Sequence, residues 1–423
     1  MPVILGACSI LLLSFVMQCV MALSTALYFH RVTTTALAAN SVVVPLMEAL
    51  MPLVLLSLIF SYLGAWALKL PAIGTALALH GIAGTISFLG NARFADMRVA
   101  DPKSLYMLAS ATTFILAWIL CSSENLRRML LAVGALVLSA LLLTIPQHAA
   151  ATSSLEVTAI DVGQGDSLLV LTPDGKTLVV DAGGPVGNSE TDSTRSAFDY
   201  GESVVSPYLW ARHISRLDAV AITHGHSDHM QGMPSLIRNL RPREVWLGLM
   251  PDTPLFDQVR SAARDVGAQI IARREGQTIP FGSARIEVLA PAKDSSAGAK
   301  AKNDDSLSLW IHYGSASALL SGDAEHEEES AIAARAPTAQ LLKVDHHGSL
   351  TSTTPSFLNA VHPGFAVISV GEHNRFGHPR REVLERLQNA HVRTFRTDTL
   401  GAVTFRLSAD GTMTVTAPSW ENR

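Results

Sequence analysis

Long, nearly uninterrupted apolar runs occupy the first third of the chain. Four of them are interpreted as membrane-spanning helices, at about residues 3–29, 42–68, 104–121 and 129–145. At a rise of about 1.5 Å per residue, a helix of roughly 20 apolar residues crosses the hydrocarbon core of a bilayer. A fifth stretch, residues 71–92, is rich in glycine and is predicted to be either a further span or an interfacial segment. Residues 1–147 are therefore predicted to form a transmembrane domain of four or five helices.

The pattern changes after a short polar linker at residues 148–154. Residues 167–172 and 177–181 flank a Pro-Asp-Gly-Lys turn signal and are predicted to pair as a hairpin. Further strands are expected at residues 155–162, 217–223, 245–248, 283–289, 307–313, 318–321, 341–344, 366–370 and 403–407. Helical patterns lie between several of them, near residues 230–240, 255–266, 325–335, 355–361 and 380–390. This mixture predicts a layered α/β domain with two mixed sheets over residues 155–423.

Charge follows the same division. Residues 1–150 carry 11 charged side chains, about 7% of that segment, whereas residues 151–423 carry 57, about 21%. The second segment has 25 basic and 32 acidic side chains, a balance of −7, which does not indicate a protein that binds nucleic acid through bulk charge. All three cysteines lie in the apolar part, so the second segment can offer neither a disulfide nor a thiolate metal ligand.

The clearest chemical signal follows a predicted strand. Three histidines and one aspartate fall within six residues, at His224, His226, Asp228 and His229. Imidazole and carboxylate are the ligands that divalent transition metals prefer. The spacing lets His224 and His226 reach one ion while Asp228 and His229 reach a second ion about 3.5–4 Å away.

Other ligand-type residues repeat the same placement. Asp181, Asp323 and the pair His346 and His347 each follow a predicted strand, and His378 precedes a predicted helix. Because strand ends in a layered α/β domain meet where loops converge, these side chains are expected to share one site. His373 lies close to His378 in the sequence, and its role is left open.

These motifs resemble the metallo-β-lactamase fold superfamily over residues 155–423. Within it, the run Asp161–Ser167, His346-His347-Gly348-Ser349 and Asn374–Pro379 are similar to the ComEC family of DNA-internalisation competence proteins. In the apolar part, Phe29-His30-Arg31-Val32, Ala39-Asn40 and Pro45 resemble the end of that family's competence domain. The resemblance implies an αββα sandwich of metallo-β-lactamase type after the transmembrane domain. Compared with the family's larger members, the chain is expected to lack their amino-terminal region, either as a natural split or shortened version or as a fragment from a wrongly assigned gene start.

The resemblance also implies roles for individual residues. The metal ligands would be His224, His226, Asp228, His229, Asp323 and His347, with His346 as a further candidate. Asp228 and His378 would be catalytic, Asp181, Asp161, Asp166 and Asn303 would support the ligands or the local structure, and Ser349 and Arg375 would hold substrate phosphate. One or two divalent ions, Zn²⁺ or Mn²⁺, are expected. The superfamily's usual third histidine for the first ion is missing, because His312 lies inside a predicted strand.

The implied function is a component of DNA uptake in the bacterial inner membrane. Its hydrolase domain would degrade the strand that is not transported, through a metal-bound hydroxide that attacks a phosphodiester. Single-stranded DNA and membrane lipid would be its partners, with other competence proteins or a separate chain supplying the amino-terminal region. Two alternatives stay open: a membrane-tethered hydrolase of small molecules without a DNA role, and a non-catalytic pore component that binds metal.

Overall fold

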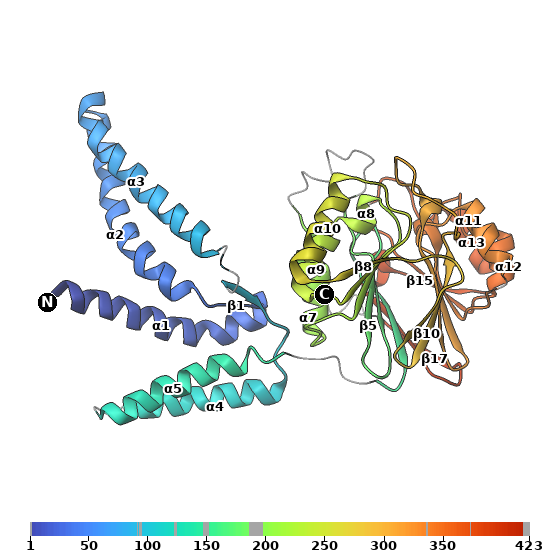
Figure 1. Cartoon of the computed structure of the whole chain (residues 1–423), viewed down its shortest axis with the longest axis horizontal. Coiled ribbons are helices and arrows are strands. Elements are labelled where there is room, and N and C mark those ends of the chain that lie inside the picture. Colours follow the sequence, from blue (N-terminus) through green and yellow to red (C-terminus); the bar gives the residue numbers. More distant parts are fainter. Residues whose placement is uncertain are drawn as a thin grey trace. The chain divides into compact units, whose positions relative to one another are not determined.

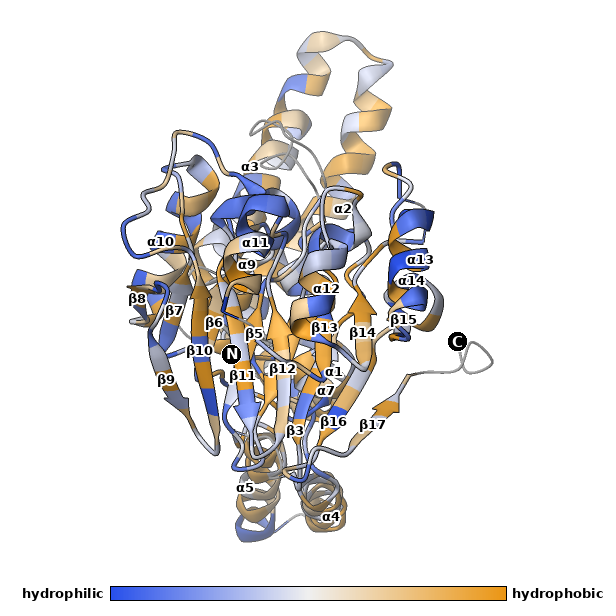
Figure 2. Ribbon diagram, turned by 90° about the vertical axis from the view of Figure 1, so that its right-hand side faces the viewer, coloured by the Kyte–Doolittle hydropathy of each residue, from blue (hydrophilic) through white to orange (hydrophobic). Residues whose placement is uncertain are grey.

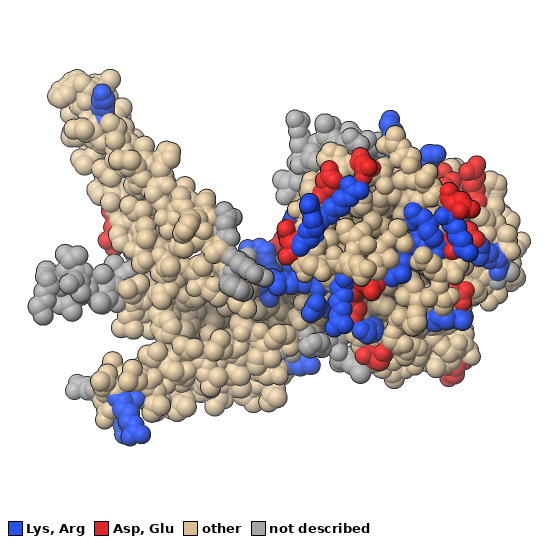
Figure 3. All heavy atoms as spheres, viewed as in Figure 1, with Lys and Arg blue, Asp and Glu red and all other residues tan. Residues whose placement is uncertain are grey.

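The computed structural model describes residues 2–90, 92, 95–121, 125–146, 152–185, 198–335, 337–372 and 374–417. The chain divides into two compact units, Met1–Gln147 and His148–Arg423, and each is described by itself (Figure 1). Most of the predicted linker at 148–154 and the residue His373 lie outside the part of the chain that the structure describes. Lys, Arg, Asp and Glu crowd the surface of the second unit, whereas the visible face of the first is largely uncharged (Figure 3).

The first unit is built from helices. They are α1 (Pro2–Phe29), α2 (Ala36–Ser61), α3 (Ala65–Gly90), α4 (Ser104–Cys121) and α5 (Leu126–Leu142), with a small antiparallel ribbon of β1 (Arg31–Thr33) and β2 (Asp96–Arg98). Helices α2 and α3 form one hairpin, and α4 and α5 form another. In the second hairpin the hydroxyls of Ser110 and Ser139 lie 2.9 Å apart and are buried, which gives these polar groups a partner inside an apolar unit.

Four of these helices are long and apolar enough to cross a membrane: Leu11–Phe29 of α1, and α2, α3 and α4. The open prediction for residues 71–92 is thereby decided in favour of a span-length helix. The predicted span at 129–145 is α5, which has 17 residues and is not among the four. The predicted run 42–68 differs from the structure at both ends, because α2 begins at Ala36 and the chain turns at Gly64, whose φ is +108°.

The second unit contains two sheets. The first has the strand order β17-β16-β3-β4-β5-β6-β7-β8. Its strands are β3 (Leu155–Ala159), β4 (Leu168–Leu171), β5 (Thr177–Val180), β6 (Ala219–Ile222), β7 (Glu244–Leu247), β8 (Gln269–Ala272), β16 (Val403–Leu407) and β17 (Met413–Thr416). The second has the order β15-β14-β13-β12-β11-β10-β9. Its strands are β9 (Thr278–Phe281), β10 (Ala284–Ala290), β11 (Ser308–Tyr313), β12 (Ala316–Leu320), β13 (Leu341–Lys343), β14 (Phe365–Ile368) and β15 (Arg393–Arg396).

Helices cover the outer face of each sheet (Figure 1). Beside the first sheet lie α7 (Ser206–Ala211), α8 (Ser227–Met230), α9 (Met233–Leu240) and α10 (Pro254–Val266). Beside the second lie α11 (His326–Ala333), α12 (Pro355–Val361) and α13 (Arg381–Asn389), and the short helix α14 (Thr397–Leu400) follows β15. The predicted αββα sandwich is thereby confirmed.

Apolar burial explains these layers. Val157 and Phe405 of the first sheet pack with Ile286 and Leu309 of the second in one core between the sheets. A second core joins the outer face of the second sheet to α12 and α13 through residues such as Phe357. Figure 2 shows apolar residues along the central strands and hydrophilic residues on α11 and α13. Burial on both faces accounts for the continuous apolar runs from which the central strands were predicted.

Candidate metal centre

Parallel strand pairs bring the candidate ligands to one rim of the sandwich. In the first sheet β5 and β6 run parallel as neighbours, and in the second sheet β12 and β13 do the same. Asp181 follows β5, and the loop from Thr223 follows β6 and enters α8. Asp323 follows β12 and His347 follows β13. Because parallel neighbours end at the same edge, the sequence places these side chains together before any ligand is present.

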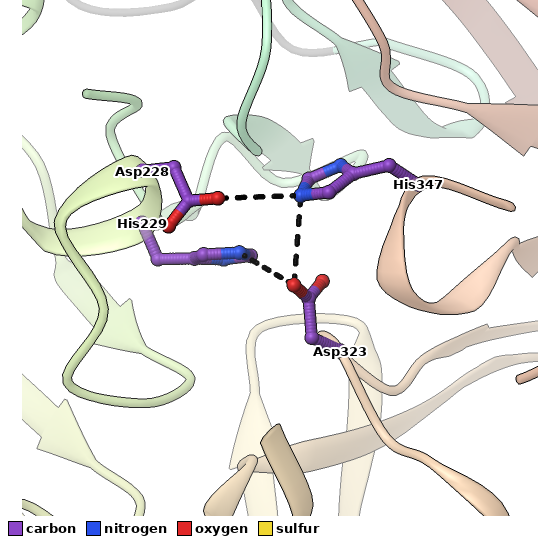
Figure 4. Close-up of side chains that lie close together, drawn as sticks. All are labelled: Asp228, His229, Asp323 and His347. Atoms are coloured by element: carbon purple, nitrogen blue, oxygen red, sulfur yellow. Dashed lines mark ion pairs between the residues drawn. The ribbon is translucent and has the colours of Figure 1, made fainter. Parts of the chain in front are cut away.

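Four of the predicted ligands meet in one buried group (Figure 4). Asp228, His229, Asp323 and His347 each offer one ligand atom, and these atoms all lie within 4.8 Å of one another. The Nε2 atom of His229 is 3.1 Å from Oδ2 of Asp323. The Nε2 atom of His347 is 3.5 Å from the same oxygen and 3.7 Å from Oδ2 of Asp228. Two imidazoles and two carboxylates therefore converge on one point.

Hydrogen bonds at Nδ1 fix the orientation and the tautomer of the His229 and His347 rings. His229 donates from Nδ1 to Oδ2 of Asp181 at 2.7 Å, and His347 donates from Nδ1 to the carbonyl oxygen of Ser369 at 2.9 Å. A neutral ring that donates from Nδ1 keeps a lone pair on Nε2, which is the form a metal requires. Both Nε2 atoms are buried and have no hydrogen-bond partner. The donor set, the tautomers and the two orphaned nitrogens fit a divalent metal ion.

Electrostatics agrees with a site built for a cation. Burial opposes charge on Asp323, yet the facing imidazoles and the ammonium of Lys343 hold the pKa of its carboxyl well below the ordinary value. Burial also opposes a charged imidazole, but the carboxylates of Asp323 and Asp181 raise the pKa of His229 well above the ordinary value. A divalent ion at this point would compete with protons for the same Nε2 atoms, so its binding would depend on pH.

His224 and His226 lie beside this group rather than within it. Nε2 of His224 and Nδ1 of His226 are 2.9 Å apart and hydrogen-bond to each other. His224 is fully buried, and its ring centroid is 4.3 Å from that of His229. Among the residues that the structure describes, no third ligand joins this pair in a group of the same tightness. Their role as ligands of a first ion stays a prediction.

Asp166 and Lys343 form an ion pair at the base of the centre. Both side chains have no solvent exposure, and Lys343 also donates to the carbonyl oxygen of Gly322 at 2.7 Å. From the sequence, Asp166 was predicted to have only a supporting role, and Lys343 was missed. Its signal was a single charge at the end of an otherwise apolar run, Leu341-Leu342-Lys343-Val344, directly before the His346-His347 motif.

Polar residues that were predicted to assist lie around the group without joining it. His346 is 3.1 Å from Oε1 of Glu325, which also accepts from Nδ2 of Asn303 at 3.1 Å. Oδ1 of Asp161 accepts from the backbone N–H of Gly163 at 3.2 Å and so supports a turn. The hydroxyl of Ser349 pairs with that of Thr351 at 3.0 Å. These contacts favour structural roles for Asn303, Asp161 and Ser349.

His378 lies at the edge of the site, with its ring centroid 5.8 Å from that of His346. Burial and the neighbouring histidines lower the pKa of His378 to about 4. The ring is therefore neutral at pH 7, which suits hydrogen bonding to a substrate. Asn374 holds this loop, because its Oδ1 accepts from the backbone N–H of His378 at 2.9 Å. The side chain of Arg375 is exposed.

Comparisons with known proteins cover both units. Residues 3–124 match the family model described as "Competence protein", and residues 197–364 match the one described as "Beta-lactamase superfamily domain". The chain is 29% identical over 400 residues to ComE operon protein 3 of Bacillus subtilis (strain 168), and this match covers 92% of this chain and 51% of that protein. It is 28% identical over 319 residues to Competence protein ComA of Neisseria gonorrhoeae, and this match covers 74% of this chain and 41% of that protein. The chain thus spans about half or less of these relatives.

One solved structure is similar to part of the chain. The metallo-β-lactamase-fold protein YhfI from Bacillus subtilis is 13% identical, with a TM-score of 0.38, and the match covers 62% of this chain and 100% of that one.

Proposed function

Since the chain is a homologue of the ComEC competence proteins that joins a competence domain to a β-lactamase-superfamily domain, we propose that it is a membrane component of DNA uptake whose second unit is a metal-dependent nuclease. The substrate would be the DNA strand that is not transported, cleaved at its phosphodiester bonds. The chain would lie as a multi-pass protein in the bacterial inner membrane, with other competence proteins or a separate chain as partners.

One observation carries the hydrolytic part of this proposal. The Nε2 atoms of His229 and His347 are buried, lack hydrogen-bond partners and face the carboxylates of Asp228 and Asp323. Buried polar atoms without partners cost free energy, so such an arrangement is retained where a ligand completes it. Zn²⁺ or Mn²⁺ fits this all-nitrogen and oxygen donor set. When bound, a divalent ion supplies Lewis acidity and lowers the pKa of water.

The chain's own residues would position the substrate. Neutral His378 offers a hydrogen bond at the edge of the site, and Asn374 fixes it by accepting from His378 N–H and by donating to the carbonyl oxygens of Gly371 and His378 at 3.0 and 2.7 Å. His346 is half-buried beside it. The imidazoles of His378 and His346 can hydrogen-bond to phosphate oxygens without adding negative charge to the site.

A second candidate function is hydrolysis of a small molecule without a DNA role. The net charge of −7 over residues 151–423 favours it, because DNA is repelled by bulk negative charge. A non-catalytic pore component that only binds metal is the third outcome of the test below.

The test uses the full-length chain, purified in detergent without a histidine tag and stripped of metal. It is incubated with single- and double-stranded DNA in the presence of Mn²⁺ or Zn²⁺. We expect metal-dependent cleavage by the wild type and by Asp294→Ala, which changes an exposed carboxylate of a loop. Asp228→Ala should lose cleavage by at least a hundredfold, since it removes one of the four converging ligands.

Each result separates the candidates. Cleavage retained in Asp228→Ala contradicts the site assignment. Bound metal without DNA cleavage contradicts the nuclease and favours the small-molecule hydrolase, whose substrates would then be screened as esters, thioesters and lactams. Bound metal without any hydrolysis favours the pore component.

A further inference from the structure

A series of neighbouring rings leads from the candidate metal centre to the surface. The ring centroids of His347 and His346 lie 6.2 Å apart, and those of His346 and His378 lie 5.8 Å apart. The ring of Phe376 comes next, 5.8 Å from that of His378 and inclined to it by 10°. Exposure rises along the series, from 2% for His347 to 42% for Phe376. An exposed apolar ring is thereby connected, ring by ring, to one of the four converging ligands.

Backbone contacts hold the loop of Phe376 against the loop that carries His347. Gly348 directly follows this ligand, and its carbonyl oxygen accepts from the backbone N–H of Arg380 at 2.9 Å. A Cβ atom at Gly348 would lie 2.6 Å from Cβ of Pro379, so the two loops are in close contact. The place of Phe376 beside the centre is therefore set by the packing of two loops, one of which positions a ligand.

Positive charge surrounds the exposed ring. Single exposed apolar residues are common on protein surfaces, so the exposure of Phe376 alone would carry no weight. Residues 372–381, however, contain three arginines and one glutamate, a balance of +2, whereas residues 151–423 have a balance of −7. The side chains of all three arginines, Arg375, Arg380 and Arg381, are exposed. A flat apolar ring among cations is the combination that binds single-stranded nucleic acid, because the ring stacks on a base while the cations attract phosphates.

We propose that Phe376 is a positioning residue whose exposed ring stacks on an unpaired nucleobase and so brings a neighbouring phosphate of the same strand to the metal centre. Inside a duplex the faces of each base are covered by adjacent base pairs, so the ring selects single-stranded DNA. This inference deepens the proposed function and rests on DNA being its substrate. It also explains how a domain of negative net charge can hold DNA, since the contact is local and largely apolar.

The test compares three substrates of the full-length, metal-loaded chain in detergent: a single-stranded oligonucleotide, the same strand in a duplex, and a single strand in which abasic residues replace the bases. The wild type should have a lower KM for the single strand than for the duplex. Phe376→Leu should raise the KM for the single strand about fivefold or more and retain kcat. Phe376→Trp keeps a flat ring and should keep the wild-type KM. On the abasic strand the difference between wild type and Phe376→Leu should disappear, because no base is present to stack.

Phe365→Leu is the matched control. Phe365 is half-buried at the start of β14, the opposite end of that strand from Ser369, whose carbonyl oxygen holds His347. Its KM for the single strand should equal that of the wild type. A wild-type KM in Phe376→Leu, or an equal rise on the abasic strand, overturns the proposal while leaving the nuclease intact. So does a Phe376→Trp variant that behaves like Phe376→Leu, because a flat ring would then not be what the substrate requires. A wild type that binds metal but cleaves none of the strands contradicts the nuclease itself, and this inference with it.

Discussion

His229 donates a hydrogen bond from Nδ1 to Oδ2 of Asp181 across 2.7 Å, and the same oxygen accepts from the hydroxyl of Thr223 at 2.7 Å. Oδ1 of Asp181 accepts from the backbone N–H of Thr223 at 2.8 Å. The carboxylate is thus fully occupied, and its orientation is set by the residue that precedes the histidine motif. Asp181 consequently controls the tautomer in which His229 presents itself, although the two residues are 48 positions apart.

Asp181→Asn should weaken metal binding about 10- to 100-fold. An amide group at this position can place N–H donors against Nδ1 of His229, which moves the ring proton to Nε2 and removes the lone pair needed by the ion. Calorimetric titration of the stripped full-length chain with Mn²⁺ or Zn²⁺ measures the change.

Asp218→Asn is the matched control for that substitution. Asp218 directly precedes β6, at the opposite end of that strand from Thr223, and accepts from Lys176 Nζ at 2.7 Å. Its affinity for metal should equal that of the wild type. Equal affinity in Asp181→Asn would show that the hydrogen bond does not set the ligand form of His229.

A glycine contact holds the helix that carries two of the ligands. A Cβ atom at Gly184 would lie 1.9 Å from the carbonyl oxygen of Ser227, in the first turn of α8. Gly184→Ala must therefore displace the segment that carries Asp228 and His229. We expect a loss of about 1–3 kcal/mol in the free energy of unfolding together with at least tenfold weaker metal binding. Denaturant titration and calorimetry measure the two effects.

Gly364→Ala provides the comparison for that change. A Cβ atom at Gly364 meets only the carbonyl oxygen of Gln340, at 3.9 Å, which is an ordinary contact. This variant should keep both stability and metal affinity. If Gly184→Ala behaved like Gly364→Ala, the close approach of the 181–184 segment to α8 would not position the ligands.

Metal removal should destabilise the second unit. An ion that binds only the folded state adds about 2.7 kcal/mol to the free energy of unfolding when its concentration is 100 times the dissociation constant. A chelator should therefore lower the denaturant midpoint of the wild type. His347→Ala, which removes one of the four converging ligands, should be insensitive to the chelator. A wild-type midpoint that does not respond to chelation would argue against a tightly held ion.

The sequence predicted the central strands of the two sheets better than their edge strands. The strands that it missed are β8, β9, β15 and β17, which are the four edge strands of the two sheets. Their residues are largely exposed or half-buried, as in Gln269–Ala272 and Met413–Thr416, so no continuous apolar run marks them. Central strands such as β4 are buried along their whole length and read as apolar runs.

A similar contrast holds for the site. Asp228, His229, Asp323 and His347 were predicted because ligand-type residues at strand ends have a recognisable pattern. The pairing of Lys343, on β13 of the second sheet, with Asp166, in the loop between β3 and β4 of the first sheet, joins residues 177 positions apart, and only the packed structure shows it. The sequence also could not show that His224 and His226 lie beside the group of four, because the spacing of residues in a loop does not determine where their side chains point.

The buried carboxylate of Glu156 links β3 to β16, its neighbour in the first sheet. Glu156 of β3 is 4% exposed, and it accepts from Nε of Arg406 on β16 at 3.0 Å and from the guanidinium of Arg212. Burial opposes its charge, but these two arginines lower the pKa of Glu156 below the ordinary value of a glutamate. A carboxyl group with a lowered pKa in the folded state adds stability above its unfolded pKa and loses it as the pH falls through the folded value.

Glu156→Gln should therefore lower the free energy of unfolding at pH 7 by about 1–2 kcal/mol, a modest amount because both arginines remain partly exposed to solvent. The difference between wild type and variant should shrink as the pH falls through the lowered pKa of folded Glu156, where this side chain takes up a proton and comes to resemble glutamine. Denaturant midpoints at pH 7, 5 and 4 follow this difference, and Glu382→Gln, on the exposed start of α13, should show none. A difference that grows toward low pH would mean that Glu156 is protonated in the folded state at neutral pH, and that the arginines do not stabilise its charge.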